Sequence, residues 1–141
     1  MTVGNPASDP AFAPLSELRS LLLKTHKILM DAEKERYEAS YGVIPNKGEY
    51  LRLVLGHEQF SWLRPISQLI VNMDEVLMAK QPQAPERAAE LLNQAQHLLR
   101  DSEIGHRFQE RIATLSRSNS EMAAMAQSMD ELLATGHSDP A

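Results

Sequence analysis

Apolar residues recur at intervals of three and four along most of the chain, which is the spacing of one face of an α-helix. The first stripe predicts a helix over about 15–41, ended by Gly42. Similar stripes predict helices over about 49–55, 65–79, 85–100, 104–117 and 122–135. No segment alternates like a β-strand. The pattern predicts an all-α, single-domain antiparallel helical bundle of about five to six helices, with 15–41 and 65–79 as its spine.

The two ends of the chain have a different composition from the middle. Residues 1–14 contain three prolines and one charged residue, which predicts a flexible N-terminal tail, although Phe12 could still dock onto the domain. The bundle domain is predicted over 15–135. Residues 136–141 follow the last stripe and are predicted to form a frayed C-terminus.

The helix predicted over 65–79 carries apolar residues on almost every side, which is typical of a buried helix. The only tryptophan, Trp62, lies just before it. A bundle with few aromatic residues uses its tryptophan more often in the core than at a binding surface, so Trp62 is predicted to be core. Arg64, beside these apolar residues, is predicted to pair with a carboxylate or with carbonyl groups at a helix end.

Composition narrows the possible classes of protein. A chain of 141 residues that is 43% hydrophobic can bury one core without crosslinks. The absence of cysteine excludes disulfides, zinc–thiolate sites and thiol catalysis. A net charge of −5 disfavours nucleic acid, and no apolar run reaches the ~20 residues that span a bilayer. Because the N-terminus also lacks a secretory signal, we expect a soluble cytoplasmic protein.

Two polar residues fall within or beside the apolar stripes. His26 is predicted to be a partly buried histidine with one ring nitrogen bonded to a neighbour, rather than a ligand or proton carrier. Asp74 interrupts the helix over 65–79, and an unpaired buried carboxylate would be costly. Asp74 therefore either meets a polar group on another helix, His26 or Tyr37, or lies at the rim beside Glu75.

No complete metal or catalytic motif is present. Glu103 and His106 have the spacing of half a di-iron site, but the other ligands of such a site are missing. We predict no metal and no cofactor. Arg107 and Arg111, one turn apart, are interpreted as a solvated face.

The last helix carries methionines where leucine would be more usual, at Met122, Met125 and Met129. Methionine adapts to irregular surfaces, so these residues are candidates for an interface with a partner or a second copy of the chain. The alternative is a peripheral core helix.

One segment carries a recognisable pattern, F-x-W-L-R-P-x-S-x-L-I-x3-D, over Phe60 to Asp74. With His26-Lys27, Glu33 through Tyr37-Glu38, and Gly42 and Gly48 before it, the run over 22–74 resembles a set of short, uncharacterised bacterial helical proteins. The resemblance covers less than half of the chain. It implies a helical fold and a bacterial source, and it implies no activity. It draws attention to His26, Tyr37, Arg64 and Asp74 as polar residues in an apolar frame.

Two main hypotheses for function follow. The first is a non-enzymatic interaction protein that binds itself or another protein, based on the apolar helix over 65–79 and the methionine-rich last helix. The second is a small-molecule-binding protein, or an enzyme, with a polar pocket between helices built on His26, Tyr37, Arg64 and Asp74. A nucleic-acid-linked regulator is a third hypothesis.

Overall fold

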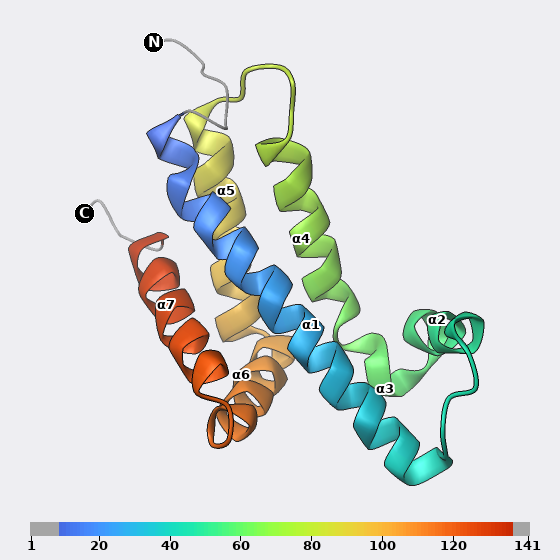
Figure 1. Ribbon diagram of the computed structural model, residues 1–141. Coiled ribbons are helices and arrows are strands. Elements are labelled where there is room, and N and C mark those ends of the chain that lie inside the picture. Colours follow the sequence, from blue (N-terminus) through green and yellow to red (C-terminus); the bar gives the residue numbers. More distant parts are fainter. Residues whose placement is uncertain (1–8, 137–141) are drawn as a thin grey trace.

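The computed structural model describes residues 9–136, and within this range it contains helices and no β-strand (Figure 1). Four helices form a bundle in which sequential neighbours run antiparallel: α1 (Ala13–Tyr41), α4 (Arg64–Leu77), α5 (Pro85–Gln96) and α7 (Ser120–Gly136). Helix α6 (Glu103–Ser116) crosses one end of the bundle, and α2 (Lys47–Gly56) with α3 (Glu58–Ser61) projects to one side. The predicted all-α bundle is confirmed.

The apolar stripe of each bundle helix faces one shared core. Trp62 is buried in this core, as predicted. The core side chains of the four bundle helices and α6 include Leu15, Leu18, Leu22, Leu29, Ile66, Leu69, Met73, Leu91, Ala95, Phe108 and Ile112. The periodic spacing of these residues is therefore what selects the helical fold.

The ordered part of the chain begins earlier than the sequence indicates. Residues Pro10–Phe12 form a short 3-10 helix (η1), and the Asp9 carboxylate accepts a hydrogen bond of 2.9 Å from the Ala11 amide. Phe12 is 1% exposed and belongs to the core. The prediction of a flexible tail is thus wrong for residues 9–14, because burial of one phenylalanine ring anchors the segment. Residues 1–8 and 137–141 lie outside the described range.

Helix α1 ends at Gly42, as predicted. Gly42 has φ of +97°, a conformation that favours glycine, and its amide donates to the Glu38 carbonyl at 2.9 Å. The chain then enters the side arm, which we define as residues 42–61. The arm has a small core of its own around Ile44, Leu53 and Phe60.

Helix α4 begins at Arg64, one residue before the predicted start, but it is not buried on every side. Val71 is 46% exposed and Met78 is 66% exposed. Helix α4 packs against α1 and α5, and within residues 9–136 no third element covers its remaining side. The prediction that this helix is buried on almost every side is therefore wrong.

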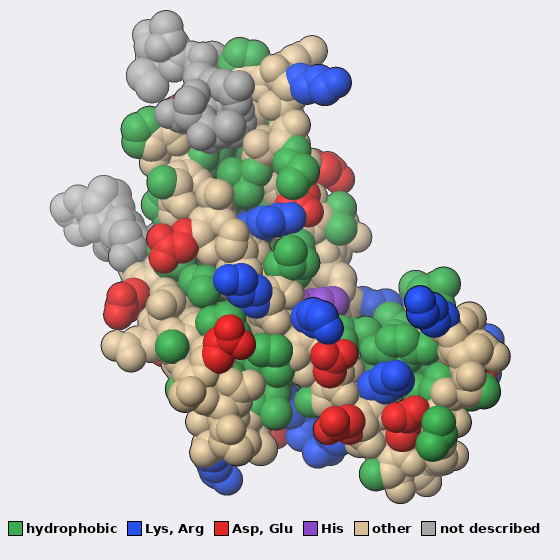
Figure 2. All heavy atoms as spheres, in the orientation of Figure 1, with side chains coloured by type: hydrophobic (Ala, Val, Ile, Leu, Met, Phe, Trp, Pro, Cys, Tyr) green, Lys and Arg blue, Asp and Glu red, His purple; other side chains and the backbone are tan. Residues whose placement is uncertain are grey.

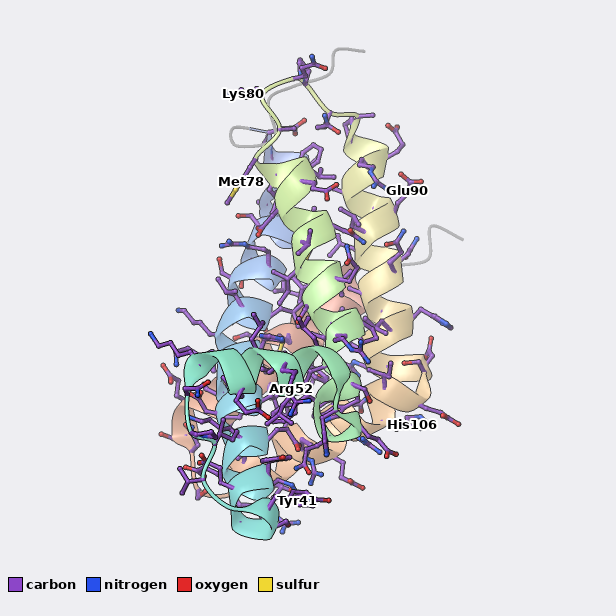
Figure 3. The ribbon with its side chains drawn as sticks, turned by 90° about the vertical axis from the view of Figure 1, so that its right-hand side faces the viewer. Tyr41, Arg52, Met78, Lys80, Glu90 and His106 are labelled. Carbon is purple, nitrogen blue, oxygen red and sulfur yellow. The ribbon has the colours of Figure 1, made fainter. Side chains whose placement is uncertain are left out.

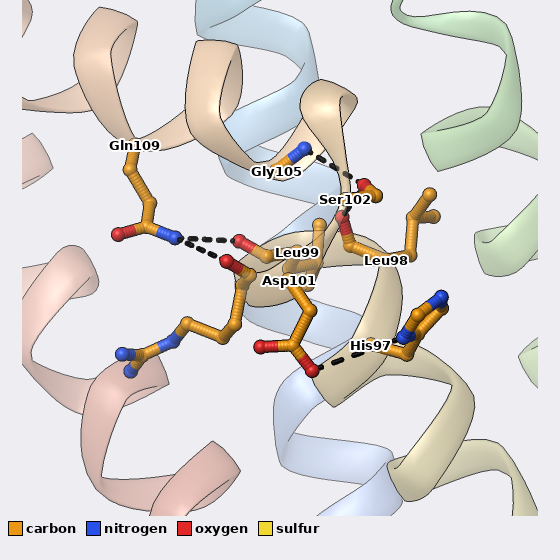
Figure 4. Close-up of polar contacts among 8 residues, drawn as sticks. His97, Leu98, Leu99, Asp101, Ser102, Gly105 and Gln109 are labelled. Atoms are coloured by element: carbon orange, nitrogen blue, oxygen red, sulfur yellow. Dashed lines mark hydrogen bonds and ion pairs between the residues drawn. The ribbon is translucent and has the colours of Figure 1, made fainter.

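A single π-helical turn, η2 (His97–Asp101), joins α5 to α6 (Figure 4). The Ser102 hydroxyl donates to the Leu98 carbonyl at 2.6 Å and accepts from the Gly105 amide at 3.0 Å, so it caps α6. The Gln109 amide donates to the Leu99 carbonyl at 3.0 Å. These bonds hold the first turn of α6 directly against the backbone of η2.

On the face shown in Figure 2, Lys and Arg side chains are interspersed with Asp and Glu side chains, and neither sign forms a continuous patch. None of the helices in residues 9–136 combines the length and the apolar character needed to cross a membrane.

Candidate functional site

Asp74 pairs with α1, but through a residue that the sequence did not indicate. Its Oδ1 accepts a hydrogen bond of 2.6 Å from Arg19 Nε, and both side chains are partly exposed. The prediction that Asp74 meets His26 or Tyr37 is therefore wrong. Arg19 lies on the turn of α1 that faces Asp74, and its long side chain brings the guanidinium to the carboxylate. A partly exposed pair of this kind contributes at most about 1 kcal/mol.

His26 bonds to α4 through Ser67. The distance from His26 Nε2 to Ser67 Oγ is 2.6 Å. Neither residue lines the polar cavity that is described below. Burial lowers the pKa of His26 below its ordinary value of 6.5. The interpretation of a partly buried, bonded histidine is confirmed.

The lowered pKa of His26 predicts how stability depends on pH. The unfolded chain takes up this proton at a higher pH than the folded chain, so the free energy of unfolding should decrease as the pH falls below 6.5. The decrease should level off once the pH is below the folded-state pKa. Urea denaturation between about pH 7.5 and pH 5 should show a flatter curve for His26→Gln than for the wild type. Parallel curves would contradict the assignment.

Arg64 and Tyr37 also have separate partners. Arg64 Nη1 donates to the Leu55 carbonyl at 2.8 Å, at the end of α2, which confirms the predicted helix-end contact. The Tyr37 ring packs 4.8 Å from Tyr41 and 5.1 Å from His57. The four predicted site residues therefore do not form one pocket.

The methionines of α7 are core residues. Met122, Met125 and Met129 are all buried within the chain, and Met129 Sδ lies 4.0 Å from the Thr25 hydroxyl. The prediction that they form an interface is wrong, and the alternative of a core helix is right. Their side chains fill the space between α7, α1 and α5, where an adaptable side chain suits an irregular gap.

Glu33, on α1, is the buried charge that the sequence analysis missed. It is 2% exposed. Its Oε2 accepts a hydrogen bond of 2.9 Å from Gln59 Nε2 and lies 3.8 Å from Arg36 Nε. Its Oε1 lies 3.1 Å from Arg111 Nε, an ion pair in which the N–H does not point at the oxygen. Three elements thus meet at one carboxylate.

The spacing of the α1 stripe contained a signal for this residue. The buried positions Leu22, Thr25 and Leu29 continue at Glu33, four residues further on. The signal is easily missed, because the half of the helix that follows Met30 is rich in charged residues. A charged residue that continues a buried stripe is a candidate for a buried ion pair.

A cavity of about 340 Å³ opens beside Glu33, between α1, α3 and α6. We call it the polar cavity. Its lining is mostly ionic and aromatic: Glu33, Arg36, Tyr41, His57, Glu58, Gln59, Arg107, Glu110 and Arg111. A pocket with several convergent polar groups from different elements is the usual form of a small-molecule site.

Several hydrogen-bond donors in the polar cavity are unused. Arg107 lies 6.0 Å from the Trp62 ring and has no ion pair within residues 9–136. The terminal nitrogens of Arg111 have no hydrogen-bond partner in the described part of the chain. The Nδ1 of His57 accepts a hydrogen bond of 3.0 Å from the backbone N–H of Gln59. The neutral ring therefore carries its proton on Nε2. These groups are available to an anion.

Two carboxylates at the same cavity are unused as well. Glu58 and Glu110 are exposed, and neither carboxylate has a partner among residues 9–136. The polar cavity therefore presents unpaired charges of both signs. Within the described range no group of three histidine or carboxylate side chains is arranged to hold a metal ion.

Comparison of this chain with protein-family models, with curated proteins and with solved structures finds no match. The resemblance of the run over 22–74 to short bacterial proteins stays a prediction.

Proposed function

We propose that this protein binds a small molecule in the polar cavity between α1, α3 and α6. The observation that supports the proposal most is the set of unpaired ionic side chains, Arg107, Glu58 and Glu110, on one hollow anchored by buried Glu33. A buried ion pair contributes little net stability, because the cost of desolvating both charges offsets their attraction. The sequence hypothesis of a pocket built on His26, Tyr37, Arg64 and Asp74 is wrong, because none of the four residues lines this cavity. The proposal shares with it only the class of function.

The test uses Trp62 as a reporter, because Arg107 lies over the only tryptophan ring of the chain. The full chain is titrated with a panel of probes: the twenty L-amino acids, acetate, citrate, inorganic phosphate and putrescine. We expect at least one probe to change the tryptophan fluorescence with saturation. For a probe that carries an anionic group, Arg107→Gln should weaken binding about tenfold or more, as expected for loss of a charged hydrogen bond.

The matched control is Arg117→Gln, an exposed arginine at the end of α6 that does not line the cavity. This variant should bind like the wild type. Absence of saturable binding by every probe, or equal weakening in both variants, would contradict the proposal.

A second candidate is an interaction protein that pairs with another copy of itself through α2. Leu51 and Leu55 are one helical turn apart on α2 and are 58% and 59% exposed. Figure 3 shows α2 lying across the bundle with Arg52 on it, and Arg52 pairs with Glu49 on the same helix. A surface with two leucines and charges of both signs is complementary to itself in a twofold contact.

Light scattering over a range of concentrations tests this candidate. The wild type should show a mass that rises toward that of a dimer. The double variant Leu51→Glu, Leu55→Glu should stay monomeric, and Leu23→Glu, an exposed leucine on α1, should behave like the wild type. A wild type that is monomeric at every concentration would exclude self-association.

A further inference from the structure

We infer that the ligand of the polar cavity is a small zwitterion, a molecule with one anionic and one cationic group and no net charge, of the α-amino acid class. The inference rests on the proposed function and specifies its ligand. It follows from the balance of charge in the lining, from the position of the unpaired groups and from the size of the hollow.

The lining of the polar cavity is electrically balanced. It contains three arginines and three glutamates, so its formal charge is zero when His57 is neutral. Glu33 is already paired with Arg111 and Arg36. The charges left without a partner within residues 9–136 are then those of Arg107, Glu58 and Glu110.

The anionic group of the ligand is assigned to Arg107. A guanidinium donates two parallel hydrogen bonds to a carboxylate, and Arg107 makes no such contact within the described residues. His57 and Arg111 belong to the same lining and carry further donors. The ion pair with Glu33, at 3.1 Å, keeps the Arg111 guanidinium beside this hollow before the ligand arrives.

The cationic group of the ligand is assigned to Glu58 and Glu110. They come from α3 and α6, on different elements of the same cavity. Their charge repels a second anionic group on a ligand, while the arginines repel a polyamine. Both kinds of discrimination favour a molecule that carries one charge of each sign.

The volume supports a small ligand. About 340 Å³ lies near the lower limit of ~300–1,000 Å³ for pockets that enclose small molecules. A free amino acid fits within this volume.

The decisive experiment compares three forms of one amino acid by isothermal titration with the full chain. The probe is whichever L-amino acid with an uncharged side chain binds most tightly, together with its N-acetyl derivative, which lacks the cation, and its amide, which lacks the anion. We expect the amino acid to bind at least about tenfold more tightly than either derivative, since each derivative loses one charged contact. Inorganic phosphate and putrescine should bind more weakly still.

Variants assign each half of the ligand to its side chain. Glu110→Gln should weaken the amino acid about tenfold and leave the N-acetyl derivative unchanged. Arg107→Gln should weaken the amino acid and leave the amide unchanged. Glu103→Gln, exposed on α6 outside the cavity, is the control. Because Glu110 and Arg107 have no ion pair within residues 9–136, both variants should fold, and denaturation curves are to check this.

The outcomes separate the two proposals. Tighter binding of phosphate or the N-acetyl derivative than of any amino acid would overturn the zwitterion and keep the binding function. Tighter binding of putrescine or the amide than of any amino acid would likewise overturn the zwitterion and keep the binding function. No binding by any probe would overturn both.

Discussion

Gly105→Ala is expected to lower the free energy of unfolding by about 2–4 kcal/mol, because it overpacks a backbone contact that cannot relax. A Cβ at this position would lie 2.6 Å from the Leu98 carbonyl oxygen, 2.7 Å from the Leu99 carbonyl carbon and 2.8 Å from the Arg100 amide nitrogen. All three are backbone atoms of η2, so no side chain can rotate away. Either α6 moves away from η2 or the π turn rearranges (Figure 4).

Urea denaturation measures this effect, with Gly56→Ala as the matched control. Gly56 also lies in a helix, but a Cβ there would have no neighbour within 4 Å. The control should be neutral or more stable by up to about 1 kcal/mol, from the higher helix propensity of alanine. Equal stability of the two variants would show that α6 does not press on η2 as described.

Glu33→Ala is expected to lower the free energy of unfolding by about 2–4 kcal/mol. The substitution leaves the Arg111 guanidinium and the Gln59 amide without the carboxylate that they contact. Removing one partner of a buried pair leaves the other charge uncompensated, which costs more than the pair contributes. The loss is smaller than for a fully buried pair, because the Arg111 side chain is 25% exposed and water can reach it.

The double variant Glu33→Leu, Arg111→Leu separates charge from packing. It removes both charges and fills the space with apolar atoms, so it should recover most of the stability lost in Glu33→Ala. Denaturation curves of the two variants provide the comparison. A double variant less stable than Glu33→Ala would show that the ion pair itself stabilises the fold.

Local periodicity was sufficient to predict the helices, because the residues of each apolar stripe lie close together in the sequence. Gly42 and the Asn46 cap, which accepts the Glu49 amide at 2.8 Å, were predictable for the same reason. Periodicity did not show which part of the fold, if any, packs against each stripe. Val71 is therefore exposed although its helix is apolar, and Phe12 is buried although its neighbours are prolines.

The polar cavity was beyond prediction because its residues come from distant parts of the chain. Glu33 lies on α1, His57 just before α3, and Arg111 on α6. Only the crossing of α6 beneath the bundle brings Arg111 to Glu33 (Figure 1). The pattern of charges on α6 alone is compatible with a solvated face, which was the interpretation of Arg107 and Arg111.

The side arm begins at Gly42 and has its own apolar centre around Phe60, apart from that of the four-helix bundle. Segments organised in this way can open as a cooperative unit while the rest of a protein stays native. Because α3 supplies one wall of the polar cavity, occupancy of the cavity would stabilise the closed arm by RT ln(1 + [L]/Kd). If the proposed ligand binds, the local melting of this arm should therefore depend on the concentration of that ligand.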